Sequence, residues 1–586
     1  MFLKIAAALI AAYCSTFLYC ITRNFFTARK TGFPSVIVPW DQNHFFWMVC
    51  SVPLRPHLQK WLPKPVYDRI VLTIYGWEFH ERMRPYEEYF GPGRNDKSFM
   101  LVTCGKSEFW TYDAEITSEV LRRPRDFQQV DLTALFMARF GHNVLTSDGD
   151  RWARQRKVIA SVINERISKA VFDESIRQTD GLLGEVYRGA LNPGEAAEST
   201  HLFDMIKKIT IHVLGGAGMG ASVPWDDDVN VKPKSGFKMT YMEAVKTVIH
   251  NVTGPIILPQ WFLSNYPSFL PGYQTLNSLS YAMQEFPTHT MDMLDQERQR
   301  SAASKDGKAR SNIMSQLLQA SESPGVDEKS KALSDEEMMG NLFIFTAAGF
   351  DTTANTLSYA VALLVRFPQW QDWLVEEIDS ILMTEVTNEE LEYTAIYPRC
   401  IRIMAFMMET LRLYTPLVHI PKQTRTPQTI QTTSGDYWLP ANTTLYLNNV
   451  ALGLDPEVWR NLNLSNEAEA TEDDELRFRP TRWLNPLGSA QPLFSPPKGR
   501  FLPWSAGPRV CPGQKMAQVE FTAVILALLR RNRIEAVPLS GESTEQVNSR
   551  LDALMKDSIS ILTLQMNGVY DVDEDKGLRL RMCKRK

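Results

Sequence analysis

The segment Leu502–Glu520 restricts the fold of this chain more than any other stretch of its sequence. It reads Leu-Pro-Trp-Ser-Ala-Gly-Pro-Arg-Val-Cys-Pro-Gly-Gln-Lys-Met-Ala-Gln-Val-Glu, so prolines and glycines surround a single cysteine, Cys511. Because proline lacks a backbone N–H and fixes its φ angle, the segment cannot be a regular helix or a central strand before Gly513. The pattern predicts a rigid loop that delivers one sulfur atom to the start of a helix.

That position favours a thiolate at Cys511. The amino terminus of a helix offers unpaired N–H groups and the positive end of the helix dipole, and both stabilise a negative sulfur. A single thiolate that approaches from one side is the axial iron ligand of oxygen-activating heme proteins. Arg509, two residues before the cysteine, is placed to meet a heme propionate. Taken alone, the cysteine could equally be a buried core thiol in a turn or a catalytic nucleophile. The flanking pattern favours the heme ligand.

Composition places the chain among globular proteins. It has 586 residues, of which 44% are hydrophobic and 22% charged, which suits a large core and excludes a disordered or fibrous chain. With a net charge of −4, nothing indicates binding to nucleic acid. The seven cysteines stand far apart and none forms a Cys-x-x-Cys pair. This spacing argues against a zinc site or a dense disulfide framework and fits a reducing compartment.

The amino terminus predicts attachment to a membrane. The stretch Ile5–Ile21 carries no charge, and as a helix it spans roughly 26 Å, the short end of what crosses a bilayer. Cations flank it, one before and three after: Lys4, Arg23, Arg29 and Lys30. The positive-inside bias then puts the bulk of the chain in the cytosol. A cleaved signal peptide is the alternative, although its small-residue cleavage site is missing. A second apolar stretch, Phe45–Val52, is too short to span and lies at the interface or packs as core.

Most of the remaining chain predicts helices. Between about 60 and 300, apolar residues recur mostly at helical spacing, whereas Thr444–Ala451 is short, bears Leu, Tyr and Val, and predicts a strand. Ser334 precedes Glu337 by three residues ahead of an apolar run, which is a capping box. A long helix should therefore begin there, run towards Arg366 and stop before Pro368.

This long helix carries the run Ala-Gly-Phe-Asp-Thr-Thr at 348–353. Glycine costs about 1 kcal/mol relative to alanine inside a helix, and Asp and Thr compete for its backbone hydrogen bonds. An otherwise apolar helix should not carry these residues without a reason. One explanation is a functional role for these residues, and the alternative is a buried kink of the helix without a function.

Two further pairs stand at helical spacing. Glu409 and Arg412 are three residues apart and share a helix face, although such pairs contribute little when they are exposed. Trp152 and Arg156 are one turn apart and can face one surface, which is also typical of an ordinary amphipathic helix.

With these motifs in place, the run Trp504-Ser505-x-Gly507-x-Arg509-x-Cys511-x-Gly513 resembles the heme-binding signature of the cytochrome P450 family. The family normally has Phe at the position of Trp504, and an aromatic residue is kept. The resemblance implies the cytochrome P450 fold, mainly α with small β-sheets, as a single catalytic domain behind an N-terminal transmembrane helix. The expected parts are an anchor with its basic flank at 1–30, a proline-containing linker or interfacial segment at 31–60, and the heme-thiolate catalytic domain at 61–586.

The resemblance also implies a role for each motif. The residues that would bind heme b (iron-protoporphyrin IX) are Cys511, the axial ligand of the iron, Arg509, Trp152, Arg156 and Trp504. Asp351 would be the acid and Thr352 the alcohol of a proton relay above the heme. A buried structural network would join Glu409, Arg412 and Arg482, and breaking it should cost several kcal/mol because a charge is left unpaired.

The expected function is that of a heme-thiolate monooxygenase, which inserts one atom of O2 into a lipophilic small molecule by hydroxylation or a related oxidation. The cysteine segment resembles those of fungal members that tailor secondary metabolites. The expected location is the endoplasmic reticulum membrane, crossed once, with the catalytic domain in the cytosol. Electrons would come from the membrane-bound NADPH-cytochrome P450 reductase, steered by a basic ring made of Arg151, Arg154, Lys157, Lys498 and Lys515.

Two other functions remain open. One is a reductase-independent heme-thiolate isomerase or dehydratase, which would not need the acid–alcohol pair Asp351 and Thr352. The other is a non-catalytic heme or lipid carrier, which has no use for that pair either.

Overall fold

The computed structural model describes residues 2–90, 97–130, 137–188, 196–220, 223–226, 232–251, 258–303, 311–322, 333–385, 391–464, 470–560, 562–570 and 578–585. The chain divides into two compact units, each made of three separate segments of the sequence. Unit 1 comprises Met1–Val130, Met408–Cys511 and Lys556–Met566. Unit 2 comprises Asp131–Met407, Pro512–Met555 and Asn567–Lys586.

A six-stranded sheet organises unit 1. Its strands lie in the order β1-β2-β3-β9-β6-β4, with bounds Ser35–Ile37, Ser98–Val102, Glu108–Thr111, Thr444–Asn448, His419–Thr424 and Phe127–Gln128. The pairs β1–β2 and β3–β9 are parallel, and the other pairs are antiparallel. Every residue of β2, β3 and β9 is buried, because the sheet forms the core of this unit with aromatic side chains such as Trp77, Phe99 and Trp110.

The other elements of unit 1 surround this sheet. The helices are α1 (Phe2–Arg29), α2 (Phe45–Trp61), α3 (Lys64–Ile70), α4 (Trp77–Glu81), α5 (Arg84–Phe90), α6 (Ala114–Arg122), α20 (Asn449–Leu454), α21 (Pro456–Trp459) and the end of α19 (Ile401–Leu413). Two hairpins complete the unit, β7 (Gln428–Thr432) with β8 (Gly435–Leu439) and β11 (Ser558–Ser560) with β12 (Leu564–Met566).

The strand expected at Thr444–Ala451 ends earlier than predicted. β9 stops at Asn448, whose side chain accepts a hydrogen bond from Ala451 N (3.0 Å) and so caps α20. An asparagine side chain that satisfies a helix-end N–H favours the change from strand to helix at this point.

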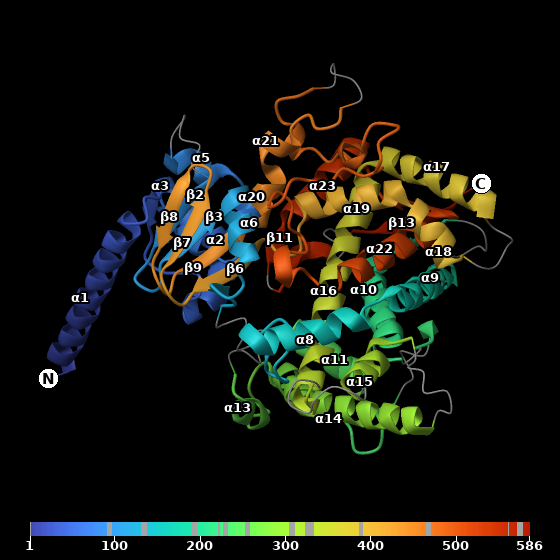
Figure 1. The fold of residues 1–586 in the computed structure, drawn as a ribbon, viewed down its shortest axis with the longest axis horizontal. Helices are drawn as coiled ribbons and strands as arrows, with labels where there is room; N and C mark the ends of the chain where they lie inside the picture. Colours follow the sequence, from blue (N-terminus) through green and yellow to red (C-terminus); the bar gives the residue numbers. More distant parts are fainter. Residues whose placement is uncertain are drawn as a thin grey trace. The chain divides into compact units, whose positions relative to one another are not determined.

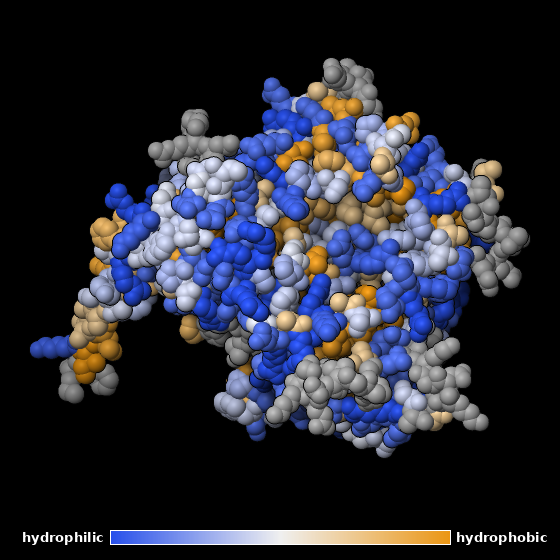
Figure 2. Space-filling view, viewed as in Figure 1, coloured by the Kyte–Doolittle hydropathy of each residue, from blue (hydrophilic) through white to orange (hydrophobic). Residues whose placement is uncertain are grey.

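Helix α1 contains the apolar stretch predicted to cross a membrane. Near its C-terminal end, Asn24 Nδ2 donates to Thr103 O (2.9 Å) and Gly105 O (2.7 Å), while the earlier turns extend away from the sheet (Figure 1). Apolar side chains such as Leu9 and Leu18 are exposed on these turns (Figure 2). Among the residues that the structure describes, no helix is long and apolar enough to cross a membrane, so the predicted transmembrane helix is not found.

The second apolar stretch is helical as well. Phe45–Val52 forms the first half of α2, where Trp47 packs against the core of unit 1 while Phe46 is 72% exposed.

Unit 2 is mainly helical. Its helices are α8 (Gly149–Val162), α9 (Glu165–Arg188), α10 (Leu202–Val213), α11 (Tyr241–His250), α13 (Gln260–Ser264), α14 (Tyr273–Ala303), α15 (Ile313–Glu322), α16 (Asp335–Arg366), α17 (Pro368–Glu385), α18 (Tyr393–Ile396), the start of α19, α22 (Gln514–Leu529) and α23 (Thr544–Lys556). A small antiparallel sheet joins β10 (Asn532–Ala536), β13 (Leu580–Lys584) and β5 (Ala197–Ser199) in that order.

The long helix α16 confirms its predicted boundaries. The Ser334 side chain accepts from Glu337 N (3.2 Å), and the Glu337 carboxylate accepts from Ser334 N (3.2 Å), so the capping box is formed. The helix ends at Arg366, just before the proline that begins α17. Most of α16 is buried, because a helix that is apolar on all sides belongs in a core.

Helix α16 stays helical through the run at 348–353. A Cβ at Gly349 would lie 3.0 Å from Leu214 Cδ2. Leu214 begins the π-helical turn Leu214–Gly218 that follows α10. The glycine therefore permits the close approach of these two elements.

Candidate functional site

Cys511 ends a closed loop in unit 1. Its backbone N–H donates to Trp504 O (2.9 Å). Within the loop Gly507 has a φ of +68°, and a Cβ there would lie 2.6 Å from Leu121 O, so the position requires glycine. The Cys511 side chain is exposed and is not in a disulfide. Since α22 begins at Gln514, the predicted order of rigid loop, cysteine and helix is confirmed.

The donor set at this loop fits heme. No group of three or more His, Cys, Asp or Glu side chains that could hold a metal ion occurs in the described part of the chain. A porphyrin, however, brings its own four nitrogen ligands, so the protein needs to supply only one axial ligand. One exposed thiol before a helix amino terminus meets that requirement. Trp504 and Arg509, both half-buried, belong to the same loop.

The predicted acid and alcohol lie on the buried helix α16 of unit 2. Asp351 is 9% exposed, and Thr352 is half-buried and donates through Oγ1 to Ala348 O (2.7 Å). Thr352 therefore satisfies its hydroxyl within the helix, in the way that threonines inside helices commonly do.

Lys207 on α10 interacts electrostatically with the predicted acid, which the sequence did not reveal. Burial lowers the pKa of its ammonium group, and the negative charges of Asp351 and Asp204 oppose that shift in part. A half-buried cation thus lies within electrostatic reach of the predicted acid. Only the packing of α10 against α16 makes this visible, because nothing local in the sequence links residues 207 and 351.

The predicted network around Glu409 is present in unit 1 and is fully buried. Arg412 donates to the Glu409 carboxylate through Nε (2.8 Å) and Nη2 (2.9 Å), and Arg482 donates through Nε (3.0 Å). All three side chains are 0% exposed. Burial alone would raise the pKa of Glu409, but the charges of Arg412 and Arg482 outweigh it and lower the pKa to about 2. Glu409 is therefore a carboxylate at any physiological pH.

The network is larger than the sequence indicated. Trp483 Nε1 and the backbone N–H of Arg479 also donate to Glu409, at 2.9 and 2.8 Å. Asp474 accepts from Arg482 Nη1 (2.9 Å) and from both Nε and Nη2 of Arg479 (2.9 Å each). The remaining donors of Arg412 bind backbone carbonyls, among them Gly453 O (2.7 Å). The network therefore links the end of α19 through charged groups to Gly453 and to residues 474–483. We expect it to hold the segment that precedes the cysteine loop in place.

Trp152 and Arg156 lie on α8 of unit 2, one helical turn apart as predicted, and both are half-buried. The neighbouring face of α8 binds Glu337 of α16. Arg151 Nε (2.9 Å), both terminal nitrogens of Arg154 (2.9 and 2.7 Å) and Gln155 Nε2 (3.3 Å) donate to this carboxylate.

This contact changes the interpretation of the predicted basic ring. Glu337 is 2% exposed, and although burial opposes it, the hydrogen bonds from Arg154 and Arg151 lower its pKa. Arg151 and Arg154 thus share one buried carboxylate, which offsets one of their two positive charges, and the Arg151 side chain is still 41% exposed. Of the other three members, Lys515 lies 3.9 Å from Glu165, and Lys157 and Lys498 are exposed.

Comparison with known proteins agrees with this architecture. The family model described as Cytochrome P450 matches residues 61–562. A phomenoic acid biosynthesis cluster cytochrome P450 monooxygenase from Leptosphaeria maculans is 41% identical over 569 residues, 95% of each chain. Cytochrome P450 monooxygenase 124 from Postia placenta is 30% identical over 458 residues, 77% of this chain and 79% of the relative. The crystal structure of the cytochrome P450DA heme domain aligns with 94% of this chain and 98% of that chain at a TM-score of 0.60 and 17% identity, which supports the fold alone.

The cysteine loop, the buried Glu409 network and the mainly helical fold define a heme-thiolate enzyme. The chain belongs to the cytochrome P450 family. It is a cytochrome P450 monooxygenase, and its cofactor is heme b. The cytochrome P450 fold, mainly helical with small sheets, and the heme b cofactor expected from the sequence are thereby confirmed. The roles of the individual site residues stay predictions.

Proposed function

We propose that this enzyme inserts one oxygen atom of O2 into a lipophilic small molecule during secondary-metabolite biosynthesis. The observation that carries the proposal is the exposed Cys511 side chain on its closed loop before α22. The biosynthetic setting rests on the relative at 41% identity, whose name assigns it to a phomenoic acid biosynthesis cluster. That name does not identify the substrate of this chain.

Bound heme supplies the redox and oxygen chemistry, and the residues of this chain orient and tune it. The Cys511 thiolate would hold the heme iron and would supply it with electron density, which suits oxygen activation. Arg509, Trp152 and Arg156 bind the propionate side of the macrocycle, and Trp504 packs beside the sulfur.

Asp351 and Thr352 are the proposed residues of the proton-transfer path. The Thr352 hydroxyl donates to Ala348 O in the helix, and rotation about its χ1 bond would free the same O–H group to donate a proton elsewhere. Asp351 would take up a proton from solvent and pass it to the hydroxyl, and the ammonium group of Lys207 lies within electrostatic reach of this carboxyl group. A hydroxyl in this position also excludes loose water from the reaction.

We further propose that α1 attaches the enzyme to the endoplasmic reticulum membrane with the catalytic residues on the cytosolic side. The exposed apolar side chains of α1 and the cations that follow support this arrangement. NADPH-cytochrome P450 reductase is the proposed electron donor, and the exposed Lys157 and Lys498 offer positive charge to an acidic partner.

The test uses the purified holoenzyme with NADPH, the reductase and isotope-labelled O2. Apolar candidate compounds are first screened for displacement of the heme-bound water by the shift of the Soret band. For a compound that binds, the product should gain one labelled oxygen atom, and omission of the reductase should abolish turnover. Turnover without reductase, or a product without labelled oxygen, would contradict the proposal and favour an isomerase or dehydratase.

A further inference from the structure

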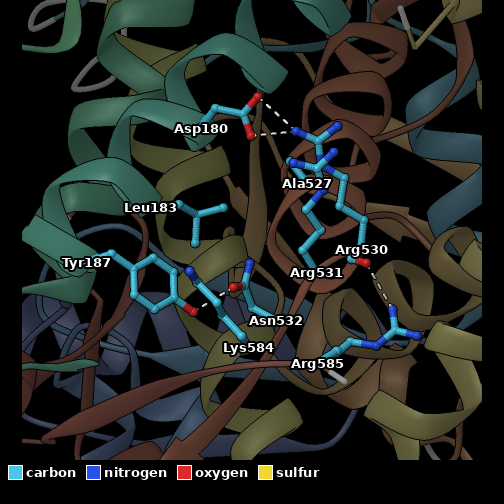
Figure 3. Close-up of a pocket in the computed structure, with 9 residues that line it drawn as sticks. All are labelled: Asp180, Leu183, Tyr187, Ala527, Arg530, Arg531, Asn532, Lys584 and Arg585. Atoms are coloured by element: carbon cyan, nitrogen blue, oxygen red, sulfur yellow. Dashed lines mark hydrogen bonds and ion pairs between the residues drawn. The ribbon is translucent and has the colours of Figure 1, made fainter. Parts of the chain in front are cut away.

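A cavity lies in unit 2, and none of the residues that line it belongs to the site described above. It encloses about 610 Å³ between α9, the C-terminal end of α22 and the β10–β13 pair (Figure 3). This volume lies in the range of small-molecule sites, roughly 300–1,000 Å³. Four of its lining residues are cations, namely Arg530, Arg531, Lys584 and Arg585, whereas Asp180 is the one acid among the described residues that line it.

The fold itself brings these cations together. The chain leaves α22 at Leu529 and enters β10 at Asn532, which places two consecutive arginines at the turn. In the antiparallel pair Asn532 faces Lys584, and one step further Arg585 N donates to Arg531 O (2.9 Å). Like charges opposite each other on paired strands destabilise the pair. A negative charge bound near these cations would therefore stabilise the strand pair.

Two of the four cations already have structural partners. Arg530 Nη2 donates to both carboxylate oxygens of Asp180 (2.6 and 2.8 Å). Arg585 Nη1 donates to Leu529 O (3.0 Å) and Arg530 O (3.1 Å), the last carbonyls of α22, and its Nη2 binds Asp379. The hydrogen bonds and ion pairs of these two arginines stabilise the C-terminal end of α22, and this structural role explains their presence.

Arg531 and Lys584 differ from them. Both side chains are exposed, and among the described residues neither has an ion-pair partner within 4.0 Å. The Lys584 Nζ atom lies 5.1 Å from the centre of the Tyr187 ring, and the Tyr187 hydroxyl is fixed by Asn532 Oδ1 (2.6 Å). The cavity thus offers two uncompensated cations beside a fixed aromatic ring.

We propose that this cavity binds a soluble metabolite bearing two or more phosphate groups, with Arg531 and Lys584 as the phosphate-binding residues. A guanidinium fork matches two phosphate oxygens at once, and a lysine adds a point charge. A single phosphate would leave most of the cavity unfilled. The remaining space is bounded by Leu183, Ala527 and the Tyr187 ring, which suits an apolar or planar portion of the same ligand.

The site is separate from the oxygen chemistry. None of its lining residues belongs to the cysteine loop, the Glu409 network or the acid–alcohol pair. Ligand binding should therefore change the stability of unit 2 without altering the thiolate ligation of the heme.

The experiment titrates the holoenzyme with inorganic pyrophosphate by calorimetry at constant ionic strength, with sulfate as the comparison anion. Saturable binding is expected for pyrophosphate, accompanied by a rise in Tm. The double variant Arg531→Ala/Lys584→Ala should bind at least tenfold more weakly, because each lost charge-assisted hydrogen bond is worth a factor of about ten or more. Its ferrous carbon monoxide spectrum should remain that of the parent, which shows that the fold is intact.

The matched control is Lys232→Ala/Lys234→Ala, which removes the same charge from two exposed lysines of unit 2 that do not line the cavity. This control should bind pyrophosphate like the parent. Three results would each overturn the proposal: no saturable binding at millimolar pyrophosphate, equal binding of sulfate, or equal weakening in the control variant.

Discussion

Replacing Glu409 with glutamine removes one negative charge from the buried network while keeping its size. Five hydrogen bonds converge on this carboxylate, from Arg412, Arg482, Trp483 and the backbone of Arg479. Glutamine carries an N–H2 group that would face these donors, and two guanidinium groups would be left in the core without their shared counter-charge. Uncompensated buried charge is among the costliest defects in a folded protein.

The magnitude follows from two independent arguments. The pKa of Glu409 falls from 4.5 to about 2 in the folded state, which corresponds to roughly 3 kcal/mol at 1.36 kcal/mol per pH unit. Removing one partner of a buried ion pair typically costs about 3–5 kcal/mol. We therefore expect Glu409→Gln to lower the free energy of unfolding by ~3 kcal/mol at pH 7.

The assay is urea unfolding of the holoenzyme, followed by far-UV circular dichroism and by loss of the Soret band. Glu198→Gln is the control, because Glu198 pairs with Arg581 at the surface, where both side chains are more than a third exposed. Such a pair contributes about 0–1 kcal/mol. If Glu409→Gln cost no more than this control, the idea that the network holds the cysteine segment would be refuted.

The same carboxylate predicts how stability depends on pH. Because the folded pKa lies below the unfolded value of 4.5, the stabilisation is complete above pH 4.5 and is lost as the pH falls towards 2. The pKa of Asp474 is lowered to about 2 as well, since its hydrogen bonds to Arg479 and the charge of Arg482 outweigh burial. The free energy of unfolding of the parent should therefore fall between pH 4.5 and pH 2. In Glu409→Gln it should fall less steeply over the same range.

Three further substitutions test the site. Glu337→Gln removes the negative charge that pairs with Arg151 and Arg154 of α8, so the amount of heme retained after gel filtration should fall severalfold. Glu337→Asp should restore part of it, and full retention in Glu337→Gln would contradict a positioning role for Glu337. Thr352→Ala should send most electrons from NADPH to hydrogen peroxide instead of product, measured as peroxide and product per NADPH, whereas unchanged coupling would remove Thr352 from the proton path. Trp504→Phe should lower the heme reduction potential in a redox titration, because an indole N–H that relieves the sulfur's charge is lost; an unchanged potential would mean that the ring only packs.

Local signals in the sequence predicted the elements that position the chemistry. The capping box at Ser334 and the proline at 368 fixed both ends of α16, because caps and prolines act on the backbone beside them. The cysteine loop was equally local, since Pro508 and Pro512 fix their own φ angles and Gly507 permits a positive φ. The Glu409 network was predicted from the resemblance to the family, because its partners lie about 70 residues apart.

Contacts between distant elements were not predictable in this way. Glu337 was expected only to cap its own helix, yet it also binds two arginines of α8. The proximity of Lys207 to Asp351 depends on how α10 packs against α16. The closeness of Gly349 to Leu214 has the same origin. Each depends on the approach of two helices, for which one sequence carries no local signal.

The most direct test of the central claim is the absorption spectrum of the reduced, carbon monoxide-treated holoenzyme, recorded beside Cys511→Ser. We predict the red-shifted Soret maximum characteristic of thiolate ligation for the parent and its absence in the variant. A folded, heme-loaded parent without that maximum, or a Cys511→Ser variant that retains it, would contradict the assignment of Cys511 as the axial ligand.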